Sequence, residues 1–386
     1  MCKKYFDDKR LRFPNYDKSI LSTITSILNY YGVDNSHVSL NSVNKIIQKK
    51  YKNVVLLILD GMGEHILNVH DKKGFFKCHE IDCVTSVYPS TTTAAMTTYY
   101  SGKCPLETGW IAWSQYFKEY GRVINMLPGT EAYTGEKLKV NGNDVFRNIV
   151  NYKTVYEMIE EKRYKAYEVA PSHVERRWKR TFIGDNLEET CAAIKDLCEI
   201  KEEKFILSYL DNPDQLIHKY GTDSLEVKEF ILDAEEKIKD LSDKVKDTLL
   251  IISADHGHKD IEKVYSILDY PELRDCLIMP EFFESRFVGF WVKENRCYDF
   301  EKIFKKEFDD FILLKAEEVL EYGLLGCGNK HKKVEDFLGN YIALSTGSSI
   351  FRIQNDYFEG KKVKKSTHCG LTKEEMEVPV IVLENK

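Results

Sequence analysis

The sequence lacks several features that would each indicate a familiar class of protein. None of its 10 cysteines stands in a CxxC pair, so the sequence does not predict a cysteine-rich zinc site, and any metal would be held by Asp and His. No apolar run reaches membrane-spanning length. Residues 1–13 carry charges where a signal peptide needs an apolar core. We therefore expect reduced thiols, a cytoplasmic location and no membrane partner.

The sequence also lacks an excess of positive charge. Its 56 Lys and Arg residues face 62 Asp and Glu residues, which gives a formal net charge of −6. A general binder of nucleic-acid polymers would need a basic face for phosphate contacts. We therefore expect a small-molecule partner instead of a nucleic-acid polymer, and nothing in the composition sets the oligomeric state.

Regular secondary structure is indicated by apolar runs that alternate with helical patterns. The clearest run is Asn53 to Leu59, NVVLLIL, which is typical of a central parallel strand because helices cover both of its faces. Further strands are predicted at Tyr164 to Ala170, Lys204 to Leu210, Thr248 to Ser253 and Val378 to Leu383. Helices are predicted at Ser19 to Tyr31, Leu40 to Gln48, Val155 to Lys162, Leu187 to Ile200 and Ser224 to Asp243.

This alternation predicts an α/β fold with a mostly parallel sheet and helices on both faces. Right-handed crossovers bring the carboxyl ends of the strands to one edge, where functional residues are expected. We expect residues 1–386 to form a single catalytic domain. Between about residues 268 and 339 the regular alternation stops, and we expect a smaller inserted α+β cap there.

The stretch from Thr85 to Trp113 places three threonines at the start of a small-residue helix that closes at Gly102. Backbone N–H groups and the positive end of the helix dipole gather at such a start, so phosphate could be held beside a hydroxyl nucleophile. The simpler alternative is that Ser90 or Thr91 only caps the helix.

Acidic residues stand just beyond three of the predicted strands. Asp60 follows the first, the segment Asp211 to His218 follows another, and Asp255 and His256 follow a third. Carboxylates gathered at one sheet edge repel one another unless cations neutralise them. This arrangement therefore indicates a metal site.

The residue types favour a particular kind of ion. Asp214 and His218 are four residues apart, so on a helical turn both side chains face the same way. A mixed set of carboxylate and imidazole ligands favours Zn²⁺ or Mn²⁺. His368, in a loop late in the chain, is a candidate third ligand. Each feature alone is more often a surface coincidence, and only the combination carries weight.

Taken in order, the motifs resemble the alkaline phosphatase superfamily, and within it the type I phosphodiesterase / nucleotide pyrophosphatase family. The resemblance extends over about residues 54–382 and implies an alkaline-phosphatase-like three-layer α/β/α sandwich with a smaller cap. The motifs that carry it are LDG with Asp60, PSTT with Thr92, DNPDQLIHKYG with Asp214 and His218, SADHG with Asp255 and His256, and STHCG with His368.

The resemblance implies two divalent metal ions, Zn²⁺ or Mn²⁺, and a threonine nucleophile that becomes covalently phosphorylated or nucleotidylated. Thr92 is the threonine at the family's spacing from the Ser101-Gly102 helix end, and Thr91 and Thr93 are the fallback candidates. One metal site would use Asp214, His218 and His368. The other would use Asp60, Asp255, His256 and the oxygen of Thr92.

One position departs from the family pattern. Family members carry an asparagine three residues after the nucleophile, where its amide helps to hold the phosphoryl oxygens, and this sequence has Ala95. Another group would have to replace that donor, and Lys103 or the backbone N–H of Thr92 or Thr93 are candidates. Other expected substrate contacts are Thr93, Trp110, Trp113 and His258, since aromatic faces can stack a nucleobase.

Three functions remain open. The resemblance favours a metal-dependent hydrolase of phosphodiesters or nucleotide pyrophosphates, acting on a small-molecule phosphoester such as a nucleotide. The first alternative is a phosphomonoesterase, a phosphonoacetate-type hydrolase or a phosphate mutase of the same superfamily. The second is a catalytically silent binding scaffold. The full set of seven residues for the implied metal sites argues against a silent scaffold.

Overall fold

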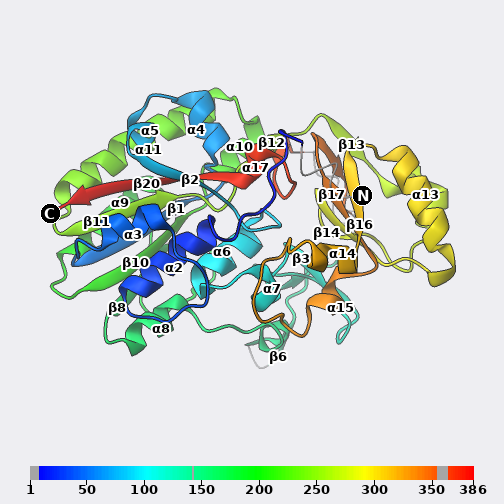
Figure 1. Cartoon of the computed structure of the whole chain (residues 1–386), viewed down its shortest axis with the longest axis horizontal. Coiled ribbons are helices and arrows are strands. Elements are labelled where there is room, and N and C mark those ends of the chain that lie inside the picture. The colour runs from blue at the N-terminus through cyan, green and yellow to red at the C-terminus, as the bar shows by residue number, and fades with distance from the viewer. Residues whose placement is uncertain (1–7, 141–142, 354–363) are drawn as a thin grey trace.

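The computed structural model describes residues 8–140, 143–353 and 364–386. Its larger lobe, on the left of Figure 1, is built on a seven-stranded sheet in the order β2-β20-β11-β1-β10-β8-β9. In chain order these strands are β1 (Asn53–Leu59), β2 (Glu80–Thr85), β8 (Lys165–Ala170), β9 (Thr181–Ile183), β10 (Lys204–Leu210), β11 (Thr248–Ser253) and β20 (Glu377–Asn385).

The centre of this sheet is parallel, as expected. Strand β1 pairs in parallel with β10 and β11, β10 pairs with β8, and β8 pairs with β9. The last strand, β20, instead runs antiparallel to β11 and to β2. It begins immediately after the short helix α17 (Lys373–Met376), so the chain enters β20 without the long crossover that a parallel strand requires.

Helices cover both faces of the sheet, which confirms the expected three-layer α/β/α fold (Figure 1). One layer holds α2 (Ile20–Tyr30), α3 (Asn41–Ile47), α6 (Thr92–Ser101) and α8 (Val155–Glu161). The other holds α4 (Glu64–His70), α5 (Phe75–Cys78), α9 (Leu187–Glu199), α10 (Asp214–Tyr220) and α11 (Leu225–Lys244).

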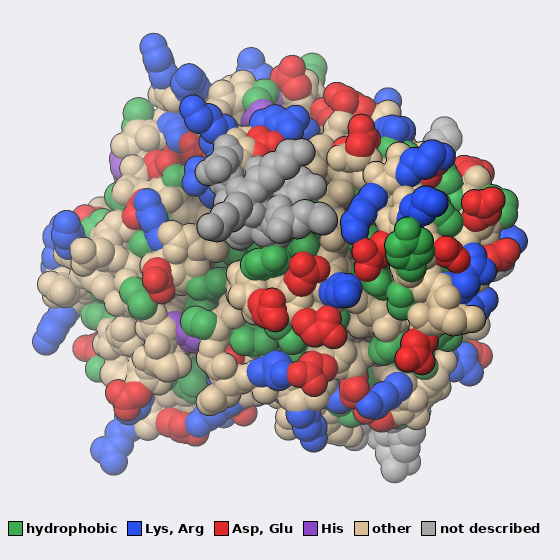
Figure 2. Space-filling model, turned by 45° about the vertical axis from the view of Figure 1, so that its right-hand side comes forward, with side chains coloured by type: hydrophobic (Ala, Val, Ile, Leu, Met, Phe, Trp, Pro, Cys, Tyr) green, Lys and Arg blue, Asp and Glu red, His purple; other side chains and the backbone are tan. Residues whose placement is uncertain are grey.

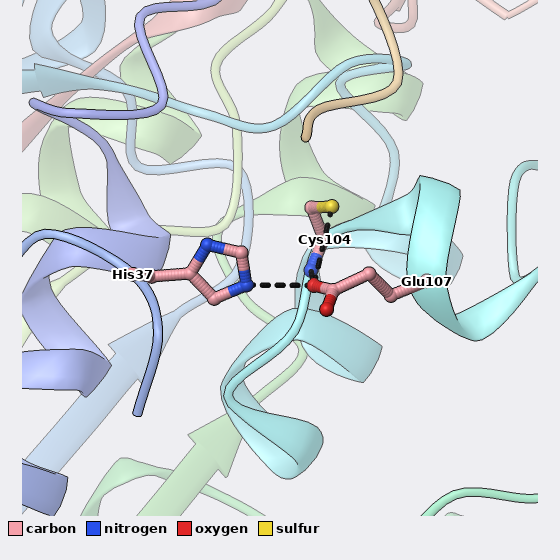
Figure 3. A group of neighbouring side chains, drawn as sticks. All are labelled: His37, Cys104 and Glu107. Atoms are coloured by element: carbon pink, nitrogen blue, oxygen red, sulfur yellow. Dashed lines mark hydrogen bonds and ion pairs between the residues drawn. The ribbon is translucent and has the colours of Figure 1, made fainter. Parts of the chain in front are cut away.

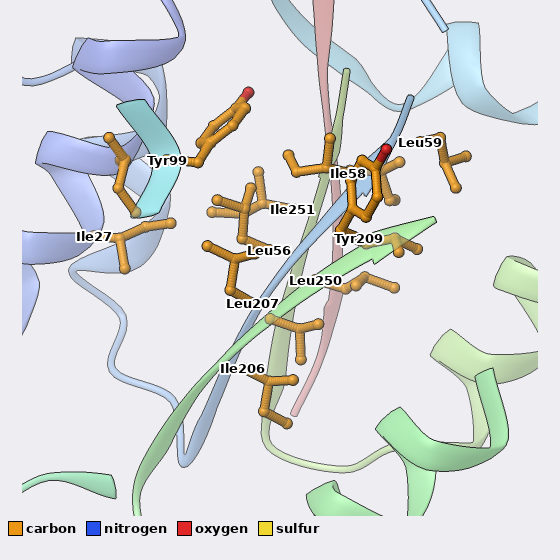
Figure 4. Close-up of a cluster of buried hydrophobic side chains, with 14 of the residues drawn as sticks. Ile27, Leu56, Ile58, Leu59, Tyr99, Ile206, Leu207, Tyr209, Leu250 and Ile251 are labelled. Carbon is orange, nitrogen blue, oxygen red and sulfur yellow. The ribbon is translucent and has the colours of Figure 1, made fainter. Parts of the chain in front are cut away.

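The main core lies between the sheet and these two layers. Every residue of β1 is buried, because helices pack on both of its faces. Figure 4 shows Leu56 and Ile58 of this strand beside Leu207 of β10 and Ile251 of β11, with Ile27 of α2 on one side. Continuous burial of these strands fixes where each one ends, and so fixes the edge at which the acidic residues emerge.

The smaller lobe contains a second seven-stranded sheet, in the order β16-β17-β15-β14-β3-β4-β5. The chain enters it twice, over residues 114–131 and 282–345, and the expected cap at residues 268–339 supplies β14, β15 and β16. We propose that both passages together form the cap. Its strands are β3 (Ser114–Phe117), β4 (Arg122–Asn125), β5 (Thr130–Glu131), β14 (Phe282–Glu284), β15 (Phe287–Phe290), β16 (Phe311–Lys315) and β17 (Tyr341–Ser345).

Short elements complete the two lobes. Helix α13 (Cys297–Glu307) packs beside the second sheet at the right of Figure 1. Small two-stranded pairings join β12 (Lys259–Asp260) to β19 (Ser366–Thr367) and β13 (Lys263–Tyr265) to β18 (Ser349–Phe351). The remaining short helices are α7 (Pro105–Thr108), α12 (Pro271–Arg274), α14 (Ala316–Glu321) and α15 (Val334–Leu338).

The molecular surface carries both signs of charge. Figure 2 shows acidic and basic side chains interspersed over the face that it presents, without a continuous basic area. On this face, such a mixture offers no broad basic area to a nucleic-acid backbone. Of the helices in the described part of the chain, none has the length and the apolar character needed to cross a bilayer.

Candidate active site

Three carboxylates meet at the carboxyl ends of adjacent strands. Asp60 follows β1, Asp255 follows β11 by two residues, and Asp214 begins α10 after β10. The backbone fixes them directly, because Asp60 N–H donates to Leu210 O at 2.9 Å and Asp214 N–H donates to Asp60 O at 2.8 Å. The sheet topology therefore gathers carboxylates that lie far apart in the sequence.

Gly61 allows the close approach of these segments. Its φ is +75°, and its N–H donates to Asp255 Oδ1 at 3.0 Å. A Cβ atom at this position would lie 2.9 Å from His258 Nε2 and 3.0 Å from the Asp214 Cα. Only glycine suits both the backbone conformation and the space.

Thr92 is the first residue of α6, and its hydroxyl faces the carboxylates. Its Oγ1 lies 3.2 Å from His256 Nε2 and 3.4 Å from Asp60 Oδ2. Thr91 is the N-cap residue, but its side chain makes no capping hydrogen bond, and Gly102 ends the helix with a φ of +65°. The simple capping alternative therefore does not account for the threonines.

A first group of possible metal ligands comprises Asp60, Asp255 and His256, whose ligand atoms lie within 4.8 Å of one another. His256 Nε2 is 3.2 Å from Asp255 Oδ2 and 3.5 Å from Asp60 Oδ1. All three residues are buried. With the hydroxyl of Thr92, this is the set that the resemblance assigns to one ion.

Asp214 is shared by two further sets of possible ligands, one with His218 and His258 and the other with His256 and His368. Its Oδ1 lies 2.7 Å from His258 Nε2, 3.4 Å from His218 Nε2 and 3.9 Å from His368 Nε2. Backbone oxygens hold two of these rings from behind, since His218 Nδ1 contacts Ser366 O at 2.7 Å and His368 Nδ1 contacts Ser90 O at 3.0 Å. With Nδ1 protonated for these contacts, each Nε2 is free to act as a ligand.

The electrostatics of the group formed by Asp60, Asp255 and His256 favour a bound cation. Burial, together with the charges of Asp255 and Asp214, raises the pKa of Asp60 well above its usual range. Asp60 Oδ1 and Asp255 Oδ2 are buried and have no hydrogen-bond partner among the described residues. Because buried carboxylates without partners are costly, a positive ion is the natural complement of this cluster.

Three histidines of the site, His218, His258 and His368, are held in the neutral form that a metal requires. Burial lowers the pKa of His218 to about 3, and it also lowers the pKa of His258. Burial and the nearby His256 lower the pKa of His368 well below its usual range. Neutral imidazoles beside carboxylates form the mixed N and O donor set of zinc and manganese sites.

A cavity of about 740 Å³ opens above Thr92. Its floor is formed by Thr92, Asp214, His218 and His368 from the larger lobe, and its far wall is formed by residues of the smaller lobe such as Phe283 and Glu284. This volume lies within the range of small-molecule binding sites. The two sheets therefore enclose a space in which a substrate can reach the threonine hydroxyl.

The expected substrate contacts occupy different places. Trp113 lines the cavity and is 41% exposed, whereas Thr93 and His258 are fully buried. Trp110 is buried in the core of the smaller lobe, and its Nε1 donates to Val150 O at 2.7 Å. Lys103 and Trp110 are not among the described residues that line the cavity, so we propose no substrate contact for either residue.

Three further residues at the site were not singled out from the sequence. Tyr209 Oη donates to Asp60 Oδ2 at 2.5 Å. Glu284 and Lys364 line the cavity, and Glu284 Oε1 accepts the Trp113 N–H at 2.7 Å. Tyr209 is in an apolar strand and the other two lie far along the chain from Thr92, so no local motif marks them.

Outside the cavity, His37, Cys104 and Glu107 form a separate polar cluster (Figure 3). His37 Nε2 lies 2.6 Å from Glu107 Oε2, and the Cys104 thiol contacts the same oxygen at 3.4 Å. Two ligands of one tetrahedral zinc ion would stand roughly 3.3 Å apart at usual bond lengths. The shorter distance is that of a hydrogen bond, so this cluster anchors the start of α7 to the segment after α2.

The fold is an α/β/α sandwich that gathers carboxylates, histidines and a threonine hydroxyl at one edge of its sheet. The family model for type I phosphodiesterase / nucleotide pyrophosphatase matches residues 54–318. The chain therefore belongs to this family of phosphodiesterase and pyrophosphatase-type hydrolases, which confirms the resemblance noted in its sequence. No curated protein matches the chain.

Solved structures support the same fold. Murine ectonucleotide pyrophosphatase/phosphodiesterase 5, an inactive variant in complex with AMP, has a TM-score of 0.64 and 16% identity, covering 86% of this chain and 87% of its own. The human counterpart has a TM-score of 0.62 and 14% identity, covering 85% and 87%. Phosphonoacetate hydrolase from Sinorhizobium meliloti, with phosphonoformate, has a TM-score of 0.63 and 16% identity, covering 86% and 90%.

Proposed function

We propose that this protein is a metal-dependent hydrolase of phosphodiester or nucleotide pyrophosphate bonds in which Thr92 is the nucleophile. The observation that carries the proposal is the position of the Thr92 hydroxyl. It lies at the floor of the cavity, at the start of α6, and its oxygen is 3.2 Å from His256 Nε2 and 3.4 Å from Asp60 Oδ2. No other described threonine of that turn has these neighbours.

Two divalent ions would be held by the two groups of ligands. Asp60, Asp255, His256 and Thr92 would hold one ion. Asp214, His218 and His368 would hold the other, and His258, which is within hydrogen-bond distance of Asp214 Oδ1 at 2.7 Å, would support that carboxylate. When bound, such ions lower the pKa of a ligating hydroxyl and neutralise the negative charge of a phosphoryl group. Zn²⁺ is the ion that we expect, and Mn²⁺ suits the same ligands.

The residues of the chain perform two displacements at phosphorus. Thr92 Oγ1 attacks phosphorus, the bond from phosphorus to the leaving oxygen breaks as a phospho- or nucleotidyl-threonine forms, and the hydroxyl proton departs with the leaving group. A water molecule then attacks phosphorus, the bond to Thr92 Oγ1 breaks, and a proton of that water restores the hydroxyl as the product leaves. We expect the backbone N–H groups at the start of α6 to hold the phosphoryl oxygens.

The cavity wall supports a substrate that extends beyond its phosphoryl group. Trp113 presents an exposed ring that could stack a planar group, Glu284 supplies hydrogen-bond acceptors, and Lys364 supplies a positive charge. One similar structure holds AMP, so a nucleotide is our first candidate.

The nine described cysteines are free thiols, which is typical of a reducing compartment and supports the cytoplasmic location that we expect.

The likeness to phosphonoacetate hydrolase gives a second candidate function, cleavage of a phosphonocarboxylate. Rates on bis-p-nitrophenyl phosphate, p-nitrophenyl phosphate and phosphonoacetate, measured after zinc or manganese is restored to chelated protein, distinguish these functions. We expect the diester to be cleaved fastest. A monoester or phosphonoacetate preference above about tenfold, worth about 1.4 kcal/mol of barrier, would favour the alternatives, and no turnover of any of them would favour a silent scaffold.

A further inference from the structure

Arg286 and Glu375 form a fully buried ion pair between the two lobes. Arg286 lies in the turn between β14 and β15 of the smaller lobe, and Glu375 lies in α17, directly before β20. Arg286 Nε donates to Glu375 Oε1 at 2.6 Å, and its Nη2 donates to Oε2 at 2.8 Å. Both side chains are 0% exposed. A two-point contact of this kind fixes orientation as well as distance.

The guanidinium is also tied to the smaller lobe. Its Nη1 donates to Ser349 O at 3.1 Å and its Nη2 donates to Gly347 O at 2.6 Å. Both carbonyls belong to the segment that follows β17, which is itself part of the second sheet. Arg286 therefore links the segment after the second sheet to the carboxylate of Glu375, so the position of that carboxylate depends on the smaller lobe.

Glu375 in turn holds the loop that carries His368. Its Oε1 accepts the Gly370 N–H at 2.7 Å, and its Oε2 accepts the hydroxyl of Thr372 at 2.6 Å. Gly370 leaves the space that this contact needs, because a Cβ atom there would lie 2.7 Å from Glu375 Oε2 and 2.8 Å from Arg286 Nη2. The ion pair therefore packs directly against the backbone two residues beyond His368.

The same loop reaches the turn before Thr92. Ser90 Oγ donates to Gly370 O at 3.2 Å, and Ser90 O contacts His368 Nδ1 at 3.0 Å. His368 is thus held between the nucleophile turn on one side and the Arg286–Glu375 pair on the other. Loss of the pair would remove the support on the Gly370 side, while the contacts with Ser90, the β12–β19 pairing and the Leu371 N–H bond to Ser345 O would remain.

The other ligand group does not depend on the side chain of Glu375. Asp255 is fixed by the N–H groups of Gly61 and His256, at 3.0 and 2.9 Å. The segment after His256 is fixed by Gly257 N–H, which donates to the backbone carbonyl of Glu375 at 2.8 Å. A substitution of the Glu375 or Arg286 side chain leaves these contacts in place.

We propose that Arg286 is a positioning residue through which the smaller lobe sets the metal affinity of the group formed by Asp214, His218 and His368, and of that group alone. This inference rests on the proposed function, since it requires the two ions assigned above. Groups that support metal ligands from behind typically change metal affinity by about 10- to 100-fold when they are altered.

Stepwise zinc affinity of the full-length protein, measured by competition with a chromophoric chelator after metal removal, tests the proposal. Lysine keeps the charge of Arg286 but not its two-point contact, so Arg286→Lys should weaken one of two zinc-binding steps by about 10- to 100-fold. The other step should change by less than about threefold. His368→Ala identifies which step belongs to the His368 group, and Arg286→Lys added to His368→Ala should not weaken that step further.

Lys333→Met is the matched control. Lys333 is 5% exposed in the smaller lobe and pairs with Glu119 and Asp336, so its loss perturbs that lobe without touching the His368 loop. It should leave both zinc affinities unchanged. If Arg286→Lys does not fold, Glu375→Gln replaces it, since it alters the same contact with Gly370.

The outcomes separate the two proposals. Selective weakening of the His368 step supports the positioning role. Equal weakening of both steps, or none, overturns it while leaving the proposed function intact. Wild-type protein that binds no zinc at this site overturns the proposed function itself, and the inference with it.

Discussion

At the residue level, the chain has Ala95 at the position where family members carry an asparagine amide. Its side chain is fully buried in the main core, and a methyl group cannot donate a hydrogen bond to a phosphoryl oxygen. Lys103, one replacement considered from the sequence, is not among the described cavity-lining residues, whereas Lys364 is. Lys364 lines the cavity together with Thr92 and His368, and we propose that it replaces the missing donor.

Lys364→Ala tests this assignment. We expect kcat/KM for a phosphodiester to fall by about 100-fold, which corresponds to about 2.7 kcal/mol of transition-state stabilisation and matches the loss of one oxyanion donor. Lys365→Ala is the matched control, because Lys365 contacts His218 only through its backbone N–H in the described structure. Steady-state kinetics of both variants measure the effect. Equal kcat/KM values for Lys364→Ala and wild type would contradict the role of Lys364 and would leave the backbone N–H groups of α6 as the phosphoryl donors.

At the level of elements, the sequence predicted the strands that carry the site. The predicted bounds of β1, β10 and β11 agree with those observed, because continuous apolar runs end abruptly at Asp60, Asp211 and Ala254. Helix α6 was also predicted from its threonines and from Gly102. Parallel pairing of neighbouring strands then brings the carboxylates together without any further information.

The second sheet could not be predicted to the same extent. Its strands β3, β4 and β5 are only two to four residues long, too short for a clear alternating pattern. Of these, β3 pairs with β14, which lies more than 150 residues further along the chain, and β4 and β5 join the sheet through β3. His258 and Lys364 stand beside another distant pairing, that of β12 with β19, so their surroundings could not be read from nearby residues.

Glu281, directly before β14, should make the stability of the fold depend on pH. It is buried, and neither carboxylate oxygen has a hydrogen-bond partner among the described residues. Burial raises its pKa from 4.5 to about 7. The folded state therefore favours the protonated acid, so this residue's contribution to stability is complete below pH 4.5 and is lost as the pH rises through 7.

Glu281→Gln removes this titration. Relative to wild type, the variant should gain about 3 kcal/mol in the free energy of unfolding at pH 8, and the difference should shrink towards zero near pH 4.5. Urea denaturation at several pH values measures it. Glu272→Gln, at an exposed position, should show no such pH dependence, and a pH-independent difference for Glu281→Gln would contradict the buried-acid account.

At the level of the whole molecule, the site lies where two lobes meet. The larger lobe supplies Thr92 and the metal-ligand candidates, and the smaller lobe supplies the opposite wall of the cavity. The clustered carboxylates repel one another in the folded protein unless cations are present. Metal binding should therefore stabilise the fold as a whole.

Metal removal tests this consequence. Each ion that binds only the folded state should add about 2.7 kcal/mol to the free energy of unfolding at a free concentration of 100 times its Kd. We expect chelated protein to melt at a lower temperature than zinc-loaded protein in differential scanning calorimetry. An Asp60→Asn, Asp214→Asn double variant should lose most of this difference. A melting temperature that does not respond to zinc in the wild type would argue against a metal centre.

Turnover and metal content of Thr92→Ala, compared with wild type under metal-restored conditions, test the central claim most directly. The variant should lose diester hydrolysis by more than about a thousandfold, since a covalent nucleophile has no substitute. Its metal content should stay close to that of wild type, because Asp and His supply the other ligands. A Thr92→Ala protein that binds metal and still turns over the diester at near wild-type rates would contradict the account.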